Sequence, residues 1–151
     1  MIIEVNENNI YDAAMIHSES WIDSHKQFCS REFIEQHTVE HQIKYLRNEI
    51  QNGKKLYMLV EDKPVGIVSI QENLIENLYI KPNEQRKGYG TILLKMAIDK
   101  CIGTPSLCIL ENNVKAYNLY SKYGFYKTGM KNKLSENIYE IEMKQRIGTQ
   151  Q

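Results

Sequence analysis

Two spacings of hydrophobic residues divide the chain. Apolar residues recur every three or four positions over residues 10–25, after the capping residue Asn9, and over residues 31–51, before Gly53, as in amphipathic helices. From residue 55 onward, short runs rich in β-branched and aromatic residues alternate with turn-forming residues, which is typical of strands. The helical spacing returns in two later segments. The predicted strands are 2–6, 55–61, 65–71, 74–80, 106–110, 125–130 and 138–144, and the predicted helices are 10–25, 31–51, 90–101 and 113–123.

This order, βααβββαβαββ, predicts an α/β (α+β) fold with a central mixed sheet flanked by helices. The early strands are joined by short turns and should be antiparallel. Residues 74–80 and 106–110 are joined through a helix, so they should form a parallel, right-handed crossover. No repeat, low-complexity segment or linker is visible, so we expect a single domain over residues 1–145 and a frayed tail over 146–151.

Composition narrows the classes of partner. Of the 151 residues 42% are hydrophobic and 25% are charged, which are globular values, and nineteen basic residues balance nineteen acidic ones. We therefore expect neither a nucleic-acid nor a membrane partner. The N-terminus lacks the features of a signal peptide and no apolar run approaches the ~20 residues that span a bilayer, which predicts a cytoplasmic protein. Three cysteines without CxxC spacing (Cys29, Cys101 and Cys108) are expected to be reduced thiols with a structural role among apolar neighbours.

The segment "EQRKGYGT", residues 84–91, lies between a predicted strand and a predicted helix. A helix N-terminus presents unpaired N–H groups and the positive end of the helix dipole, and so can bind an anion. Gly88 and Gly90 allow close backbone approach and positive φ, while Arg86 and Lys87 add positive charge. The segment is neither GxxxxGK[ST] nor GxGxxG, so we expect a pyrophosphate site of another kind. A merely solvated turn is the alternative.

A second group of residues follows the next predicted strand, in "NNVKAYNLYSKYGF". Asn113, Ala116 and Tyr120 are spaced to share one helix face. Ligands of open sheets bind at the carboxyl ends of parallel strands, where both motifs are expected to lie. The Tyr120 hydroxyl could then donate a proton, although packing alone is the alternative.

The two motifs together resemble those of the GNAT superfamily of acyl-CoA N-acyltransferases, Q/R-x-x-G-x-G/A followed by N-x-x-A-x-x-x-Y-x-x-x-G-F. The resemblance implies a sheet that splays at the acyl-CoA site, acetyl-CoA as co-substrate and no metal. It implies that the backbone of Arg86 through Thr91 holds the pyrophosphate, that residues 78–80 and Asn113 contact pantetheine, and that Tyr120 is the general acid. The implied cofactor-binding residues are Leu78, Tyr79, Ile80, Gln85, Arg86, Lys87, Gly88, Tyr89, Gly90, Thr91 and Asn113.

The chemistry that the resemblance implies is direct attack of a neutral amine on the thioester carbonyl. A general base is less well defined. Some family members carry a glutamate near the start of the central strand, where Leu74 stands here, and Glu72 and Glu76 flank it on the same expected strand face. Either glutamate could act through water, with Glu76 taken as the candidate base; a solvated surface carboxylate and deprotonation by bulk water are the alternatives.

The first two helices of this family commonly frame the acceptor pocket. Trp21, His25 and Phe28 could form an aromatic wall there, with Asp23 or Glu19 attracting an ammonium group. Alternatively, Trp21 belongs to the core and the charges to the surface. We expect a small-molecule or peptide amine as acceptor, and a monomer or homodimer.

Two other functions compete with this interpretation. The segment "HTVEH" matches H-x-x-E-H, with His37 and His41 one helical turn apart around Glu40, as in inverted zinc peptidases. A polar helix face near a helix start is the favoured explanation, because no convincing third ligand follows and the chain is short for a peptidase. A non-catalytic acyl-CoA sensor would keep the glycine turn but would not need Tyr120.

Overall fold

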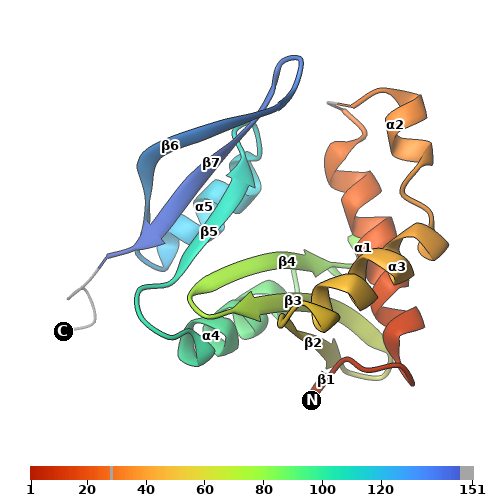
Figure 1. The fold of residues 1–151 in the computed structure, drawn as a ribbon. Coiled ribbons are helices and arrows are strands. Elements are labelled where there is room, and N and C mark those ends of the chain that lie inside the picture. Colours follow the sequence, from red (N-terminus) through yellow and green to blue (C-terminus); the bar gives the residue numbers. More distant parts are fainter. Residues whose placement is uncertain (28, 147–151) are drawn as a thin grey trace.

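The computed structural model describes residues 1–27 and 29–146. Within them, seven strands form one mixed sheet in the order β1-β2-β3-β4-β5-β7-β6 (Figure 1). The strands are β1 (Ile2–Glu4), β2 (Lys55–Val60), β3 (Pro64–Gln71), β4 (Leu74–Ile80), β5 (Ser106–Leu110), β6 (Phe125–Ser135) and β7 (Ile138–Gln145). Each predicted strand is present, and the predicted α/β fold with a central mixed sheet is confirmed.

Helices cover both faces of the sheet (Figure 1). They are α1 (Ile10–His25), α2 (Arg31–Glu35), α3 (Val39–Gln51), the short 3₁₀ helix η1 (Pro82–Glu84), α4 (Tyr89–Lys100) and α5 (Val114–Lys122). One core forms where α1 and α3 meet β2 and β3, around Ile16, Leu46 and Met58. A larger core forms around Leu93 and Leu94 of α4 and includes Met143 of β7. This larger core continues beneath β2, β3 and β4 and beneath β5, β7 and β6, and so joins these two parts of the sheet.

The predicted helix over residues 31–51 is wrong in one respect, because two helices occupy that range. Ser30 and Thr38 are both N-caps: the Ser30 hydroxyl accepts from Phe33 N–H at 3.2 Å, and the Thr38 hydroxyl accepts from His41 N–H at 3.1 Å. A capping residue has extended backbone, and Thr38 has φ −73° and ψ 166°. The chain therefore leaves helical geometry between α2 and α3.

The predicted parallel crossover through α4 is confirmed, and it ends in a split. β4 and β5 pair in parallel only at Leu74 with Ser106 and at Ile75 with Leu107. Beyond these pairs the two strands separate, while β4 continues to pair with β3 as far as Ile80. The sheet is therefore splayed beside the carboxyl-terminal half of β4, as the resemblance implied.

None of the helices in the described ranges, 1–27 and 29–146, has both the length and the apolar character needed to cross a bilayer.

Candidate active site

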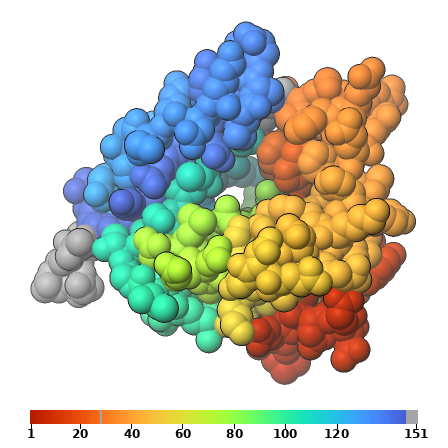
Figure 2. All heavy atoms as spheres, viewed as in Figure 1, coloured from red at the N-terminus to blue at the C-terminus, as the bar shows by residue number. Residues whose placement is uncertain are grey.

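A cavity of about 830 Å³ begins at the split between β4 and β5. Its walls are residues 75–80 of β4, the glycine turn, residues 107–110 of β5, the start of α5 and the last residues of α1. In the space-filling view a hollow lies between the blue C-terminal hairpin and the orange part of the chain that holds α1 and α2 (Figure 2). The cavity therefore brings together both motifs predicted from the sequence and the end of the first helix.

The glycine turn has left-handed backbone at its centre. Gly88 is the N-cap of α4 with φ +85°, and Arg86 has φ +67°. A Cβ on Gly88 would meet no atom within 4 Å, whereas one on Gly90 would lie 3.8 Å from side-chain atoms of Ile80 and Leu119. Gly88 is therefore required by its conformation, and the space above it is open. The α4 N-terminus has no side-chain cap among the described residues, so its first N–H groups point to the turn.

The charges around the glycine turn are partly paired. Lys87 Nζ lies 3.0 Å from the Glu84 carboxylate, and Lys63 Nζ lies 3.0 Å from its other oxygen. The hydrogen bond with Lys87, and next that with Lys63, lowers the pKa of Glu84. Arg86 has no acidic partner in the described part of the chain. Because the charge of Lys87 is already paired with Glu84, Arg86 is the better placed of the two to attract an anion. Gln85 Nε2 donates to the Ile80 carbonyl at 3.3 Å and ties the turn to β4.

Tyr120 lines the cavity from α5 and is only 7% exposed. Its ring packs edge-on against Phe125, with centroids 5.9 Å apart. Burial raises the pKa of the Tyr120 phenol, so its proton stays in place at neutral pH. Asn113 is the N-cap of α5, and its Oδ1 accepts from Ala116 N–H at 3.1 Å. Asn113, Ala116 and Tyr120 all line the cavity, as their spacing predicted.

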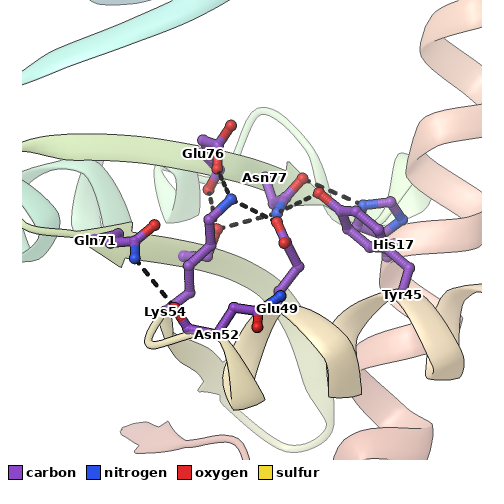
Figure 3. Close-up of polar contacts among 9 residues, drawn as sticks. His17, Tyr45, Glu49, Asn52, Lys54, Gln71, Glu76 and Asn77 are labelled. Atoms are coloured by element: carbon purple, nitrogen blue, oxygen red, sulfur yellow. Dashed lines mark hydrogen bonds and ion pairs between the residues drawn. The ribbon is translucent and has the colours of Figure 1, made fainter.

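A polar network that the sequence did not reveal lies under β4 (Figure 3). Lys54 Nζ pairs with the carboxylates of Glu49 and Glu76. Next to Glu76, Asn77 has φ +54° at an irregularity in the β3–β4 ladder. The side chain of Asn77 donates to Ser69 Oγ at 3.0 Å and accepts from His17 Nε2 at 3.3 Å. These bonds hold the bend that turns β4 away from β5.

The two carboxylates considered as bases are placed differently. Glu72 lies in the turn between β3 and β4, with φ +55°. Glu76 lies in β4, lines the cavity and is held by Lys54. The sequence predicted that both carboxylates would lie on one strand face with Leu74. That prediction is wrong, because Glu72 lies in the turn and only Glu76 lies in the strand.

On the acceptor side, Trp21 and His25 line the cavity from α1, and Phe28 lies outside the described residues. The Trp21 ring stacks on His25 at 3.9 Å and on His37 at 3.5 Å, each within 8° of parallel. Two rings this close to one indole must lie on its opposite faces. Asp23 pairs with Lys26 at 3.3 Å on the surface of α1. Trp21 is therefore half-buried in an aromatic stack, and the segment before α3 supplies its third ring.

The helical spacing expected for "HTVEH" is wrong. Thr38 caps α3, so His37 precedes the helix that contains His41. His37 Nδ1 bonds to the Phe33 carbonyl at 3.0 Å, which turns that ring toward Trp21. Among the residues placed in the structure, no group of three or more His, Cys, Asp or Glu side chains could hold a metal ion.

Cys108 differs from the apolar setting expected for it. It lies exposed on β5, lines the cavity and pairs in register with Glu142 of β7. Desolvation of the thiol, which is only partly buried, is the largest influence, and the charges of Glu140, Glu142 and Glu76 follow; together they raise the pKa of Cys108 to about 11. The thiol is therefore protonated at neutral pH.

The comparisons with known proteins agree with this geometry. A family model described as an acetyltransferase (GNAT) domain matches residues 17–147, and the chain belongs to this family. The PaiA N-acetyltransferase of Thermoplasma acidophilum, solved with coenzyme A, is similar with TM-score 0.73 and 21% identity, over 97% of this chain and 98% of that one. The ribosomal-protein-S18-alanine N-acetyltransferase of Escherichia coli matches with TM-score 0.74 and 18% identity, over 96% of this chain and 92% of that one. A putative acetyltransferase of Salmonella typhimurium, YncA, solved with acetyl-CoA, matches with TM-score 0.70 and 15% identity, over 97% and 93%. At these identities the solved structures support the fold.

Proposed function

We propose that the protein is an N-acetyltransferase that moves the acetyl group of acetyl-CoA to a primary amine of a small molecule or peptide. The observation that carries the proposal is the single cavity that joins the glycine turn, the split between β4 and β5, and Tyr120. An elongated thioester needs such a path, because its pyrophosphate and its reacting carbon lie far apart. Structures solved with coenzyme A and acetyl-CoA share this fold.

For the donor, we place the pyrophosphate at the α4 N-terminus, where the backbone of Arg86 through Thr91 offers N–H groups. Pantetheine then runs between the separated strands. Leu78, Tyr79 and Ile80 have no β5 partner beside that gap, so the backbone groups among them that do not pair with β3 are available to bond pantetheine. The Ile80 carbonyl already accepts from Ser20 Oγ and Gln85 Nε2. Asn113 reaches pantetheine with its Nδ2 group, because its Oδ1 is used as a cap.

The transfer itself needs little rearrangement. A neutral amine attacks the thioester carbonyl, backbone N–H groups near the β4 bend stabilise the oxyanion, and the C–S bond breaks. Tyr120 donates its proton to the departing thiolate. Its raised pKa suits an acid that must hold its proton until the thiolate forms.

The proposal is tested by an acceptor screen that detects free CoA thiol. Purified protein is incubated with acetyl-CoA and a panel of polyamines, aminoglycosides, amino acids and peptides, and each reaction is compared with one lacking the amine. We expect thiol release that depends on at least one amine class, with the acetylated amine detected by mass spectrometry. Tight acetyl-CoA binding without thiol release across the panel would contradict the proposal and favour an acyl-CoA sensor.

A further inference from the structure

We propose that His25, in the last turn of α1, is the general base that takes a proton from the acceptor's ammonium group. This inference rests on the N-acetyltransferase function proposed above. It assigns to one side chain a step for which the sequence offered only Glu76 or bulk water.

The hydrogen bonds of His25 define which ring nitrogen is basic. His25 Nδ1 lies 2.8 Å from the Trp21 carbonyl oxygen and 2.8 Å from Ser24 Oγ. A carbonyl can only accept, so Nδ1 must carry the proton and donate it. The Ser24 hydroxyl in turn donates to the same carbonyl at 3.1 Å, which leaves its oxygen free to accept from Nδ1. The lone pair of His25 is therefore on Nε2.

The position of the ring is fixed from two sides. Stacking on Trp21 at 3.9 Å sets the plane of the imidazole, and the Nδ1 bond sets its rotation. His25 lines the same cavity as Tyr120. His25 and Tyr120 line one cavity from different elements, α1 and α5, and in the proposed mechanism the amine lies between them.

The surroundings of His25 keep it neutral and ready to accept a proton. Burial is the largest influence on the pKa of His25 and lowers it. The hydrogen bond to the Trp21 carbonyl raises the pKa, and the charge of His37 lowers it further. On α1, Asp23 and Lys26 pair with each other. His37 lies beyond Trp21, in the segment before α3, and Glu76, Arg86 and Glu140 line the same cavity as His25. After protonation, the carbonyl and the face of Trp21 both stabilise the imidazolium.

Other groups around the cavity are less suited to this step. Glu76 already accepts from Lys54. The pKa of Cys108 is raised to about 11, and that of Tyr79 is also raised, so both side chains are protonated at neutral pH. His37, on the far face of Trp21, is not among the residues that line the cavity.

Two residues, His25 and Tyr120, account for all the protons that move during the transfer. The acceptor R–NH₃⁺ gives one proton to His25 Nε2 and becomes R–NH₂, which forms the C–N bond. As the C–S bond breaks, the CoA thiolate takes the Tyr120 proton. The phenolate regains a proton from the nitrogen of the newly formed amide through solvent, and His25 releases its proton to solvent. The net products are the acetylated amine, CoA thiol and one proton.

The first test needs no acceptor. Nitrogen-15 NMR of the imidazole rings in the purified protein, assigned with the variant His25→Gln, reports which ring nitrogen bears the proton at neutral pH. We expect the proton of His25 on Nδ1 and a lone pair on Nε2. A proton on Nε2 would overturn the proposal, because no basic nitrogen would then face the amine.

The second test measures the pH dependence of kcat/KM with the amine that reacts best in the screen. In the wild type we expect an acid limb set by a group with a pKa below the usual histidine value. His25→Gln should lower kcat/KM at neutral pH by about 100-fold and remove that limb, in line with the usual contribution of a general base. Added imidazole should restore part of the rate of His25→Ala, which a purely structural role would not allow.

His37→Gln is the matched control, because it removes an equivalent ring from the other face of Trp21. It should keep the acid limb, and the CoA affinity of all three variants should match that of the wild type. An active wild type whose acid limb survives in His25→Gln would overturn the role of His25 alone. A wild type that acetylates no amine would overturn the proposed function, and the role of His25 with it.

Discussion

At the scale of single residues, Tyr120 is the group on which the proposed chemistry depends most directly. Its ring is buried and its raised pKa keeps the proton in place. Replacing Tyr120 with Phe removes the hydroxyl and keeps the packing against Phe125. We expect kcat to fall by about 10- to 100-fold, the lower part of the range for general acid catalysis, while CoA affinity stays unchanged. Steady-state kinetics and calorimetric titration with CoA measure the two effects.

Tyr117 offers the control for that substitution, because it lies on the same helix and is 37% exposed. Its ring contacts Lys127, and Phe would preserve that contact. Tyr117→Phe should leave kcat within about twofold of the wild type. If Tyr120→Phe also keeps its full rate, the thiolate receives its proton from another donor.

His17 gives a prediction about stability. It is 4% exposed, and burial, the largest influence, lowers its pKa to about 4. In the unfolded chain the same ring has a pKa near 6.5, so below pH 6.5 the unfolded state binds a proton that the folded state does not. Stability is therefore lost as the pH falls from about 6.5 to about 4, by roughly 3 kcal/mol in total at 1.36 kcal/mol per pKa unit.

The variant His17→Gln isolates this contribution. Urea unfolding at pH 7 and pH 4.5 should show a smaller loss of stability on acidification than in the wild type, by about 2–3 kcal/mol. His41→Gln, which removes a histidine from an exposed position, is the control and should keep the wild-type loss. An equal loss in His17→Gln and the wild type would mean that other groups cause the acid sensitivity.

The site residues whose positions the sequence predicted are those defined by local spacing. Gly88 and Tyr120 belong to motifs in which spacing along one element carries the information. The His25–Trp21–His37 stack joins rings from separate segments, and the bend at Asn77 depends on Ser69 and His17. Such contacts exist only after the chain has folded, so hydrophobic spacing does not reveal them.

At the scale of elements, capping decided where the prediction for residues 31–51 was wrong. Thr38 followed by Val39 is an N-cap signal within an otherwise helical spacing of apolar residues. The position of the break also sets His37 against Trp21, so the site itself depends on the cap.

The turn before α4 leads to a prediction about its central glycine. Gly88 and Gly103 both have positive φ, +85° and +87°, and both face open space. Alanine at either position adds similar strain, about 1–2 kcal/mol for left-handed backbone. Only Gly88, however, lies where the pyrophosphate is proposed to bind.

We therefore expect Gly88→Ala and Gly103→Ala to lower the melting temperature by similar amounts. Calorimetric titration should show weaker CoA binding for Gly88→Ala, by about tenfold if the strain is relieved by moving the turn, at 1.4 kcal/mol for each factor of ten. Gly103→Ala should bind as the wild type does. Equal CoA affinities in the two variants would count against the placement of the pyrophosphate.

At the scale of the whole molecule, the sheet consists of two antiparallel parts joined by a short parallel ladder. β1 to β4 form one part and β5, β7 and β6 the other, with only two paired positions between β4 and β5. The order of strands predicted both parts and the crossover between them. It did not predict how early the pairing ends, which depends on the bend at Asn77.

In the proposed binding mode, the donor bridges these two parts of the sheet. A ligand that binds only the folded protein stabilises it by about 2.7 kcal/mol at a hundredfold excess over its dissociation constant. CoA should therefore raise the melting temperature. Hydrogen exchange should slow at residues 78–80 of β4 and at residues 86–91 of the turn, because pantetheine and pyrophosphate cover those amides in the proposed mode.

The distribution of protection distinguishes this mode from others. Desulfo-CoA, which lacks the thiol, should protect the same amides, because the contacts proposed for β4 and the turn involve the backbone and not the sulfur. Adenosine 3′,5′-bisphosphate, which lacks pantetheine and the pyrophosphate, should leave residues 78–80 exchanging at the rate of the free protein. Equal protection of residues 78–80 by CoA and by this fragment would show that pantetheine does not occupy the split, and the proposed path of the donor between β4 and β5 would then be wrong.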